Sequence, residues 1–410
     1  MAVVFVAAVS CVRITSGDAI RSDFLPPFLG TLQTAPEHAG DLSGHGVKVA
    51  MLELAWSRYE TAPGDWDVDY ERRMVEQFRT LRAAGMQVTL GLGLHYTPGW
   101  VRDLPDSRFV DQDGRRSDQV DFTFDRDVRA AADRYLQRVA QAFPAGDFFA
   151  VRITSGGRGE LLFPAGDSYW AFGPDALDAD RVATAVGANP LPDWRPGDDG
   201  EDATAVRQWY DWYVGALAET ATWQIDLLRS LGFRGYFEIL TPGVGVQPEA
   251  LDRAVAAHLP PGLAGQGVAW LDVYQRLPHD PDIVASVTST GDGSGGDVGC
   301  APEDRQVPVT STAVKSWSAA RWISRVADEF GLAKVGENPG YTAGSTFRAH
   351  YTDRSAGGLM ATSLSLARSC GYLGFYWAHD AQLWDGTVDA AEFYGYTSPD
   401  AGAPPTALQD

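Results

Sequence analysis

The chain has 410 residues, 45% of them hydrophobic and 21% charged, which is typical of a globular protein with a large core. Its formal net charge of −21 argues against nucleic acid or an anionic membrane as a partner and suits a neutral ligand such as a sugar. No apolar run in the sequence approaches the roughly 20 residues that a membrane helix needs.

Residues 1–27 precede the first expected strand and form an N-terminal segment. It begins with MAVVFVAAVSCV, an apolar run of signal-peptide length with no Lys or Arg before it. Three interpretations stay open: the remnant of a signal peptide, a lipoprotein-like end at Cys11, or a first structured segment. The sequence therefore leaves the compartment open between secreted and cytoplasmic.

From residue 28 onward, short apolar segments alternate with amphipathic ones. The short segments are apolar on both faces, which is typical of buried parallel strands. They are Phe28–Thr31, Lys48–Trp56, Gln87–Leu94, Phe148–Thr154, Gly235–Leu240, Ile283–Thr288, Ala333–Gly336 and Tyr372–Trp377. The amphipathic segments predict helices over Asp69–Ala84, Asp127–Phe143, Ala205–Leu231, Pro248–His258, Ser316–Phe330 and Ser355–Ser369. Four of these end near a glycine suited to a left-handed cap: Gly85, Gly232, Gly331 and Gly371.

Eight strand–helix units favour a closed (β/α)8 TIM barrel, of the α/β class, over a doubly wound sheet. We expect the barrel domain over residues 28–396 and a flexible tail over residues 397–410. Two long polar segments, Asp175–Asp202 and Thr290–Asp304, follow strands and are therefore expected on the C-terminal face of the barrel. They are either loops that set specificity or disordered surface loops.

Two glutamates follow strands at the face where barrels carry their active sites. Glu160 comes shortly after the fourth predicted strand, and Glu337 directly follows the seventh. Because the carboxyl ends of barrel strands surround one mouth, both side chains are expected at that mouth. Cleavage of a glycosidic bond needs such a pair: one carboxyl group protonates the leaving oxygen, and the other attacks the anomeric carbon or activates water.

These residues and their surroundings resemble the clan of (β/α)8 retaining glycosidases that includes the β-galactosidase-like families. VAMLELAWSRYETAPGDW at 49–66 is similar to the clan's second strand, GLGLHYTPGWV at 91–101 to its third and YLGFYWAH at 372–379 to its eighth. The resemblance spans Phe28 to Gly386. It implies a hydrolase of O-glycosidic bonds in carbohydrates, active in polysaccharide degradation, with Glu160 as acid/base and Glu337 as nucleophile.

One segment departs from that clan. The clan carries Asn before the strand-four glutamate, whereas this chain has Gly159, and GGRGELLFP at 156–164 resembles the acid-bearing segment of the β-amylases, which invert. We expect retention, because the strand-seven glutamate supplies the group that decides the outcome. Two alternatives stay open: an inverting, β-amylase-like hydrolase with Glu160 as acid, or a barrel that binds a glycan without cleaving it.

Ten further residues are expected to contact the substrate, from the resemblance or from their strand positions. They are Glu53, Trp56, His95, Tyr96, Trp100, Arg158, Glu238, Tyr341, Trp377 and His379. Trp377 is expected to form the floor of the sugar site, and Arg158 to replace the missing Asn. Structural alternatives stay open for some: Trp377 as a core aromatic residue, and Glu238 as a buried glutamate paired with an arginine.

The sequence predicts no metal and no cofactor. Cys11, Cys300 and Cys370 lack metal-binding spacing, the chain has only seven His, and no Gly-rich nucleotide loop follows the first strand. One disulfide and none are both open. The sugar, the linkage, exo or endo action and the oligomeric state are not indicated.

Overall fold

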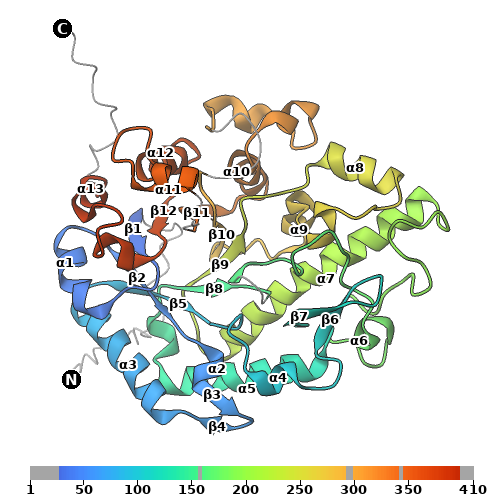
Figure 1. Ribbon diagram of the computed structural model, residues 1–410, viewed down its shortest axis with the longest axis horizontal. Helices are drawn as coiled ribbons and strands as arrows, with labels where there is room; N and C mark the ends of the chain where they lie inside the picture. The colour runs from blue at the N-terminus through green and yellow to red at the C-terminus, as the bar shows by residue number, and fades with distance from the viewer. Residues whose placement is uncertain (1–26, 156–158, 292–298, 341–344, 398–410) are drawn as a thin grey trace, which may run out of the picture.

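The computed structural model describes residues 27–155, 159–291, 299–340 and 345–397. Eight parallel strands close into a barrel in the order β1-β12-β11-β10-β9-β8-β5-β2. They are β1 (Phe28–Thr31), β2 (Val49–Glu53), β5 (Gln87–Gly91), β8 (Ala150–Ile153), β9 (Tyr236–Thr241), β10 (Ile283–Val287), β11 (Ala333–Glu337) and β12 (Gly374–Trp377). The predicted TIM barrel is thus confirmed, and each expected segment contributes one strand (Figure 1).

Residues 1–26 and 398–410 lie outside the described part of the chain. The interpretations of the N-terminal segment, and the flexible tail expected from residue 397, therefore stay predictions.

Helices surround the barrel (Figure 1). The main ones are α1 (Ala39–Gly44), α3 (Val68–Ala83), α5 (Arg126–Ala142), α7 (Ala203–Ser230), α8 (Pro248–Ala256), α9 (Trp270–Arg276), α10 (Ala319–Glu329), α12 (Leu359–Ser369) and α13 (Ala390–Gly395). All six predicted helices are present. The sequence did not reveal α9, which packs against both α7 and α10 and so continues the ring of helices. Its 7 residues make about two turns, too few for a clear periodicity.

Short helices and two-stranded sheets lie in the connections between the barrel strands and their helices. They are α2 (Trp56–Tyr59), α4 (Gly99–Arg102), α6 (Pro174–Leu177), α11 (Ser345–Thr352) and the two-stranded sheets β3 (Glu60–Ala62) with β4 (Asp65–Trp66) and β6 (Arg108–Val110) with β7 (Arg116–Val120).

Capping residues mark the ends of the long helices. The side chains of Asp67, Asp125 and Asp202 accept hydrogen bonds from backbone N–H groups at the starts of α3, α5 and α7. The glycines predicted just beyond four helices, Gly85, Gly232, Gly331 and Gly371, all have positive φ.

Apolar side chains form two clusters, one inside the barrel and one between the barrel and its helices. The inner cluster contains Phe28, Leu32, Val49, Met51, Val284, Val335, Tyr376 and Ala378. The outer cluster is much larger and contains Phe375 and Trp377 of β12. Successive residues of a strand point to opposite faces, so on β12 Tyr376 points into the barrel and Trp377 towards the helices.

The first long polar segment, Asp175–Asp202, is folded onto the outside of the molecule. Its residues Ala176, Val182 and Trp194 are buried, and the ring of Trp194 packs edge-on against Trp209 of α7. It is therefore an ordered outer layer and no disordered loop. The second segment, Thr290–Asp304, is described only at its two ends.

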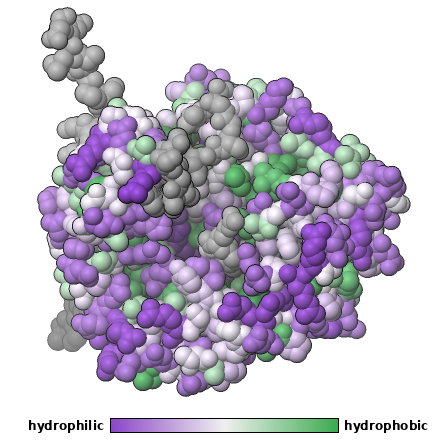
Figure 2. All heavy atoms as spheres, viewed as in Figure 1, coloured by the Kyte–Doolittle hydropathy of each residue, from purple (hydrophilic) through white to green (hydrophobic). Residues whose placement is uncertain are grey.

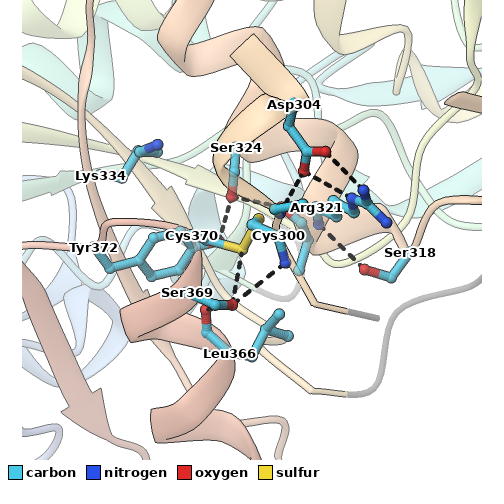
Figure 3. The surroundings of a disulfide bond; sticks show 12 residues. Cys300, Asp304, Ser318, Arg321, Ser324, Lys334, Leu366, Ser369, Cys370 and Tyr372 are labelled. Atoms are coloured by element: carbon cyan, nitrogen blue, oxygen red, sulfur yellow. Dashed lines mark hydrogen bonds and ion pairs between the residues drawn. A yellow bond between two sulfur atoms is a disulfide. The ribbon is translucent and has the colours of Figure 1, made fainter. Parts of the chain in front are cut away.

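A disulfide joins Cys300, in the segment after β10, to Cys370 at the end of α12 (Figure 3). The backbone N–H of Cys300 also donates to Ser369 Oγ (3.3 Å). Beside the disulfide, Arg321 donates to both carboxylate oxygens of Asp304 at 2.6 and 2.8 Å. Of the two options that the sequence left open, the structure therefore has the disulfide.

Hydrophilic residues dominate the face seen in Figure 2, in keeping with the strongly negative net charge. None of the helices that the structure describes is long and apolar enough to span a bilayer.

Candidate functional site

A cavity of about 250 Å³ opens at the carboxyl ends of the barrel strands. Residues expected from the sequence to form the site line it: Glu53, His95, Tyr96, Glu160, Glu337 and His379. The two glutamates singled out as a pair, from the fourth and seventh barrel strands, thus share one cavity. None of the residues of Asp175–Asp202 lines it.

Glu160 is held by its own turn and by a neighbouring strand end. The backbone N–H of Ser155 donates to the Glu160 carbonyl oxygen (3.1 Å). Gly159 has a φ of 74°, a conformation that favours glycine over residues with a Cβ atom. The hydroxyl of Thr288, which follows β10, donates to Glu160 Oε1. These contacts fix the Glu160 carboxyl group in the cavity.

Glu337 is the last residue of β11. The guanidinium of Arg152 donates from Nη2 to Glu337 Oε2 at 2.6 Å, and the backbone N–H of Thr290 donates to the Glu337 carbonyl oxygen at 2.8 Å. Burial raises the pKa of Glu337 to about 7; Arg152 opposes the rise, and the charge of Glu160 adds to it. The two carboxyl groups are therefore coupled, because the charge of Glu160 raises the pKa of Glu337.

Arg152 was not identified from the sequence. It lies in β8, in register with Gly91 of β5 on one side and Glu238 of β9 on the other. A Cβ atom on Gly91 would lie 2.3 Å from Met51 Cε, so the glycine leaves room for Met51, whose sulfur lies 3.6 Å from Arg152 Nη1. The signal in the sequence was a charged residue within an apolar strand. Such a residue is buried in the barrel, and a buried arginine requires acidic partners.

Glu53, at the end of β2, faces two polar side chains. Gln33 Nε2 donates to Glu53 Oε2 at 3.2 Å, and His95 Nε2 lies 3.6 Å from Glu53 Oε1. Burial, assisted by the charge of Arg152, lowers the pKa of His95 to about 4. The imidazole is therefore neutral near pH 7, and its contact with Glu53 is not an ion pair.

Gln33 and His379 share an uncommon backbone conformation. Their φ angles are 54° and 65°, although neither is a glycine. Both line the cavity, Gln33 just after β1 and His379 just after the adjacent β12. Backbone strain of this kind persists where the surrounding structure enforces it and gathers at binding sites. Gln33 therefore joins the candidate site. No feature of the sequence identified it, because its position depends on the closure of the barrel.

The three expected tryptophans do not line the cavity: Trp56 and Trp377 lie in the outer core, and Trp100 packs against it. Trp56 is fully buried, and its Nε1 donates to Glu60 Oε2 at 2.8 Å. Trp100 packs edge-on against Trp56. Trp377 is fully buried against Tyr351, because the alternation along β12 turns it towards the helices. The predicted sugar floor at Trp377 is corrected accordingly, in favour of the core aromatic residue.

Glu238 also does not line the cavity. Its side chain lies inside the barrel, where the Tyr376 hydroxyl donates to Glu238 Oε1 at 2.7 Å. Burial raises the pKa of Glu238, and the charge of Arg152 opposes this rise. Of the two interpretations of Glu238, its surroundings favour the second, in which it is a buried glutamate whose charge an arginine compensates. The other two expected contacts, Arg158 and Tyr341, lie outside the described residues.

Among the residues that the structure describes, no group of three or more His, Cys, Asp or Glu side chains could hold a metal ion.

No family model matches the chain, and no curated protein matches it in sequence. Solved structures do resemble it. The catalytic domain of β-amylase from Paenibacillus polymyxa superposes with a TM-score of 0.54 at 16% identity, over 92% of this chain and 98% of that one. β-Galactosidases from the psychrophilic Marinomonas ef1 (TM-score 0.51, 14% identity) and from the haloarchaeon Halorubrum lacusprofundi (0.53, 13%) each cover 85% of this chain.

The chain spans about half the length of these β-galactosidases, 53% and 52%, but nearly all of the β-amylase domain. All three relatives are glycoside hydrolases, and at such low identities the likeness establishes a common fold. The chain has the (β/α)8 barrel that these glycoside hydrolases share.

Proposed function

We propose that this protein is a glycoside hydrolase that cleaves an O-glycosidic bond of a carbohydrate, with Glu160 as acid/base and Glu337 as nucleophile. The observation that carries the proposal is the convergence of two carboxyl groups, from the fourth and seventh barrel strands, on one cavity. The common fold with β-amylase and β-galactosidases supports the same class of chemistry.

In the proposed reaction, Glu337 attacks the anomeric carbon while the bond from that carbon to the leaving oxygen breaks. Glu160 gives its proton to the leaving oxygen, so the aglycone departs as an alcohol. Glu160, now ionised, takes a proton from water, and the resulting hydroxide displaces Glu337 from the sugar. The sugar keeps its anomeric configuration, and both glutamates return to their starting states.

Further polar groups complete the proposed site. Glu53, Gln33 and His95 form a polar cluster that can accept and donate hydrogen bonds to sugar hydroxyls. His95 is neutral near pH 7, so one of its ring nitrogens accepts and the other donates.

A second candidate is the inverting reaction, in which Glu337 activates water as a general base. Two observations favour it: the likeness to the β-amylase domain extends over nearly all of both chains, and a pKa of about 7 for Glu337 suits a general base. Proton NMR of the first-formed sugar anomer separates the two reactions. A product with the configuration of the substrate supports retention, and the opposite configuration supports inversion.

A panel of nitrophenyl glycosides tests the function itself. The wild type should hydrolyse at least one member, and Glu337→Gln should reduce its rate to background, because an amide can neither form the glycosyl intermediate nor activate water. Glu249→Gln, which removes a carboxylate from α8 outside the cavity, serves as the matched control and should keep wild-type activity. Near wild-type rates for both Glu337→Gln and Glu160→Ala would refute the assignment.

Without any turnover, specific binding of a glycan by the wild type would point to the glycan-binding barrel instead.

A further inference from the structure

Arg152, a buried arginine of β8, interacts electrostatically with acidic side chains from three other barrel strands. The side chain of Arg152 is 8% exposed. Burial alone would lower its pKa, but the charges of Glu337, Glu238 and Glu53 more than offset this and raise it. These carboxylates come from β11, β9 and β2, so charges from three barrel strands act on Arg152, which itself lines the cavity.

Arg152 contacts the reacting pair through Glu337. Its Nη2 donates to Glu337 Oε2 at 2.6 Å, a short, charge-assisted hydrogen bond. The contact fixes one carboxylate oxygen of Glu337.

Glu238 lies on the other side of Arg152 and has its own support. The two residues are register partners on adjacent strands. Tyr376 donates to Glu238 Oε1 at 2.7 Å, and Thr89 Oγ1 lies 2.7 Å from the same tyrosine hydroxyl. Glu238 Oε2 is buried with no hydrogen-bond partner among the described residues. A carboxylate buried in this way is costly unless an opposite charge compensates it, and Arg152 supplies that charge.

We propose that Arg152 is a positioning residue: it holds Glu337 in place for the reaction, while the charge of Glu238, its register partner, stabilises the guanidinium from the interior of the barrel. The inference rests on the proposed function of Glu337 and adds two residues to it. It requires the two partners of Arg152 to compete for one positive charge. Loss of Arg152 and loss of the Glu238 charge should therefore shift the pKa of Glu337 in opposite directions.

The test measures the protonation of Glu337 directly and needs no substrate. Protein labelled with 13C at the glutamate carboxyl carbon is titrated by NMR, and the Glu337 signal is the one that disappears in Glu337→Gln. Arg152→Met should raise the pKa of Glu337, by about 1 to 3 units for the loss of an adjacent opposite charge. Glu238→Gln should lower it, because the Glu238 charge raises it in the wild type.

Glu238→Gln retains an oxygen that accepts the Tyr376 hydroxyl. The other charged or titratable groups around Glu337 stay in place in both variants: Glu160, Glu53, His95, Tyr376 and His379. Ser286→Ala, an uncharged change at a buried position of β10, is the control and should leave the pKa of Glu337 unchanged.

Opposite shifts support the proposal, because a general disturbance of the barrel would not produce them. An unchanged pKa of Glu337 in Arg152→Met would overturn the proposal, and so would pKa shifts of the same sign in both variants. Should Arg152→Met fail to fold, Glu238→Gln decides: a lowered pKa of Glu337 supports the inference, and a raised or unchanged one refutes it.

Kinetics on a substrate from the glycoside panel give a second readout. Arg152→Met should lower kcat on the order of 10²-fold with a nearly unchanged KM, as expected for a misplaced reacting group. Arg152→Lys should recover part of the loss. If the wild type hydrolyses no glycoside, the proposed function fails, whereas the NMR shifts still decide the role of Arg152.

Discussion

The buried carboxyl group of Glu337 should make the protein less stable as the pH rises. An exposed glutamate has a pKa of 4.5, whereas burial raises that of Glu337 to about 7. The folded state therefore binds this proton more tightly than the unfolded state does. Its stabilising effect is fully present below pH 4.5 and is lost as the pH rises to about 7. At roughly 1.4 kcal/mol per unit, the difference is on the order of 3 kcal/mol.

Glu337→Gln isolates this contribution, because glutamine does not titrate and its oxygen still accepts a hydrogen bond from Arg152. Urea unfolding of both proteins between pH 4.5 and 8 gives two stability curves. Their difference should change by on the order of 3 kcal/mol in favour of the variant as the pH rises. Titrating groups that do not interact with Glu337 cancel in this difference. Parallel curves would mean that Glu337 titrates as an exposed glutamate, and the reasoning from burial would be wrong.

Three further predictions concern the acid, its turn and the disulfide. Glu160→Ala should lose about 10²- to 10⁴-fold in kcat on alkyl glycosides but far less on dinitrophenyl glycosides, and its basic pH limb should vanish on the latter; equal losses on both substrates would point to another acid. Gly159→Ala should destabilise the protein by about 1 to 2 kcal/mol in urea unfolding, because φ is 74° there; an unchanged midpoint would contradict this. Replacing Cys300 and Cys370 by Ser should cost about 4 kcal/mol for a loop of 70 residues; equal unfolding midpoints would exclude a stabilising role.

The sequence predicted the barrel because its strands and helices follow strong local rules. Segments such as Ile283–Thr288 are apolar on both faces, which only a strand covered on both sides allows. Glycines such as Gly232 and Gly371 mark the helix ends. Glu160 and Glu337 were found for the same reason: a residue just beyond a barrel strand lies at the mouth, whatever the details of packing.

The errors at Trp377 and Arg152 share one cause, which is the direction in which a strand residue points. Trp377 was expected in the site because YLGFYWAH resembles the clan's eighth strand, but Tyr376 occupies the inward position beside it. Arg152 was overlooked within an apolar strand, although the same alternation turns it into the barrel. Which residues of a strand face the barrel interior depends on its neighbours across the sheet. Gln33 becomes part of the site only when β1 pairs with β12.

The Cys300–Cys370 disulfide has a topological consequence for the site. It closes residues 300–370 into a covalent ring that contains α10, β11 and α12, and therefore Glu337. A protease that cuts once within this ring leaves both fragments attached to each other, so the nick is visible on a gel only after reduction. The strand that carries Glu337 thus stays covalently attached to the rest of the barrel after such a cut, through the end that the cut leaves intact.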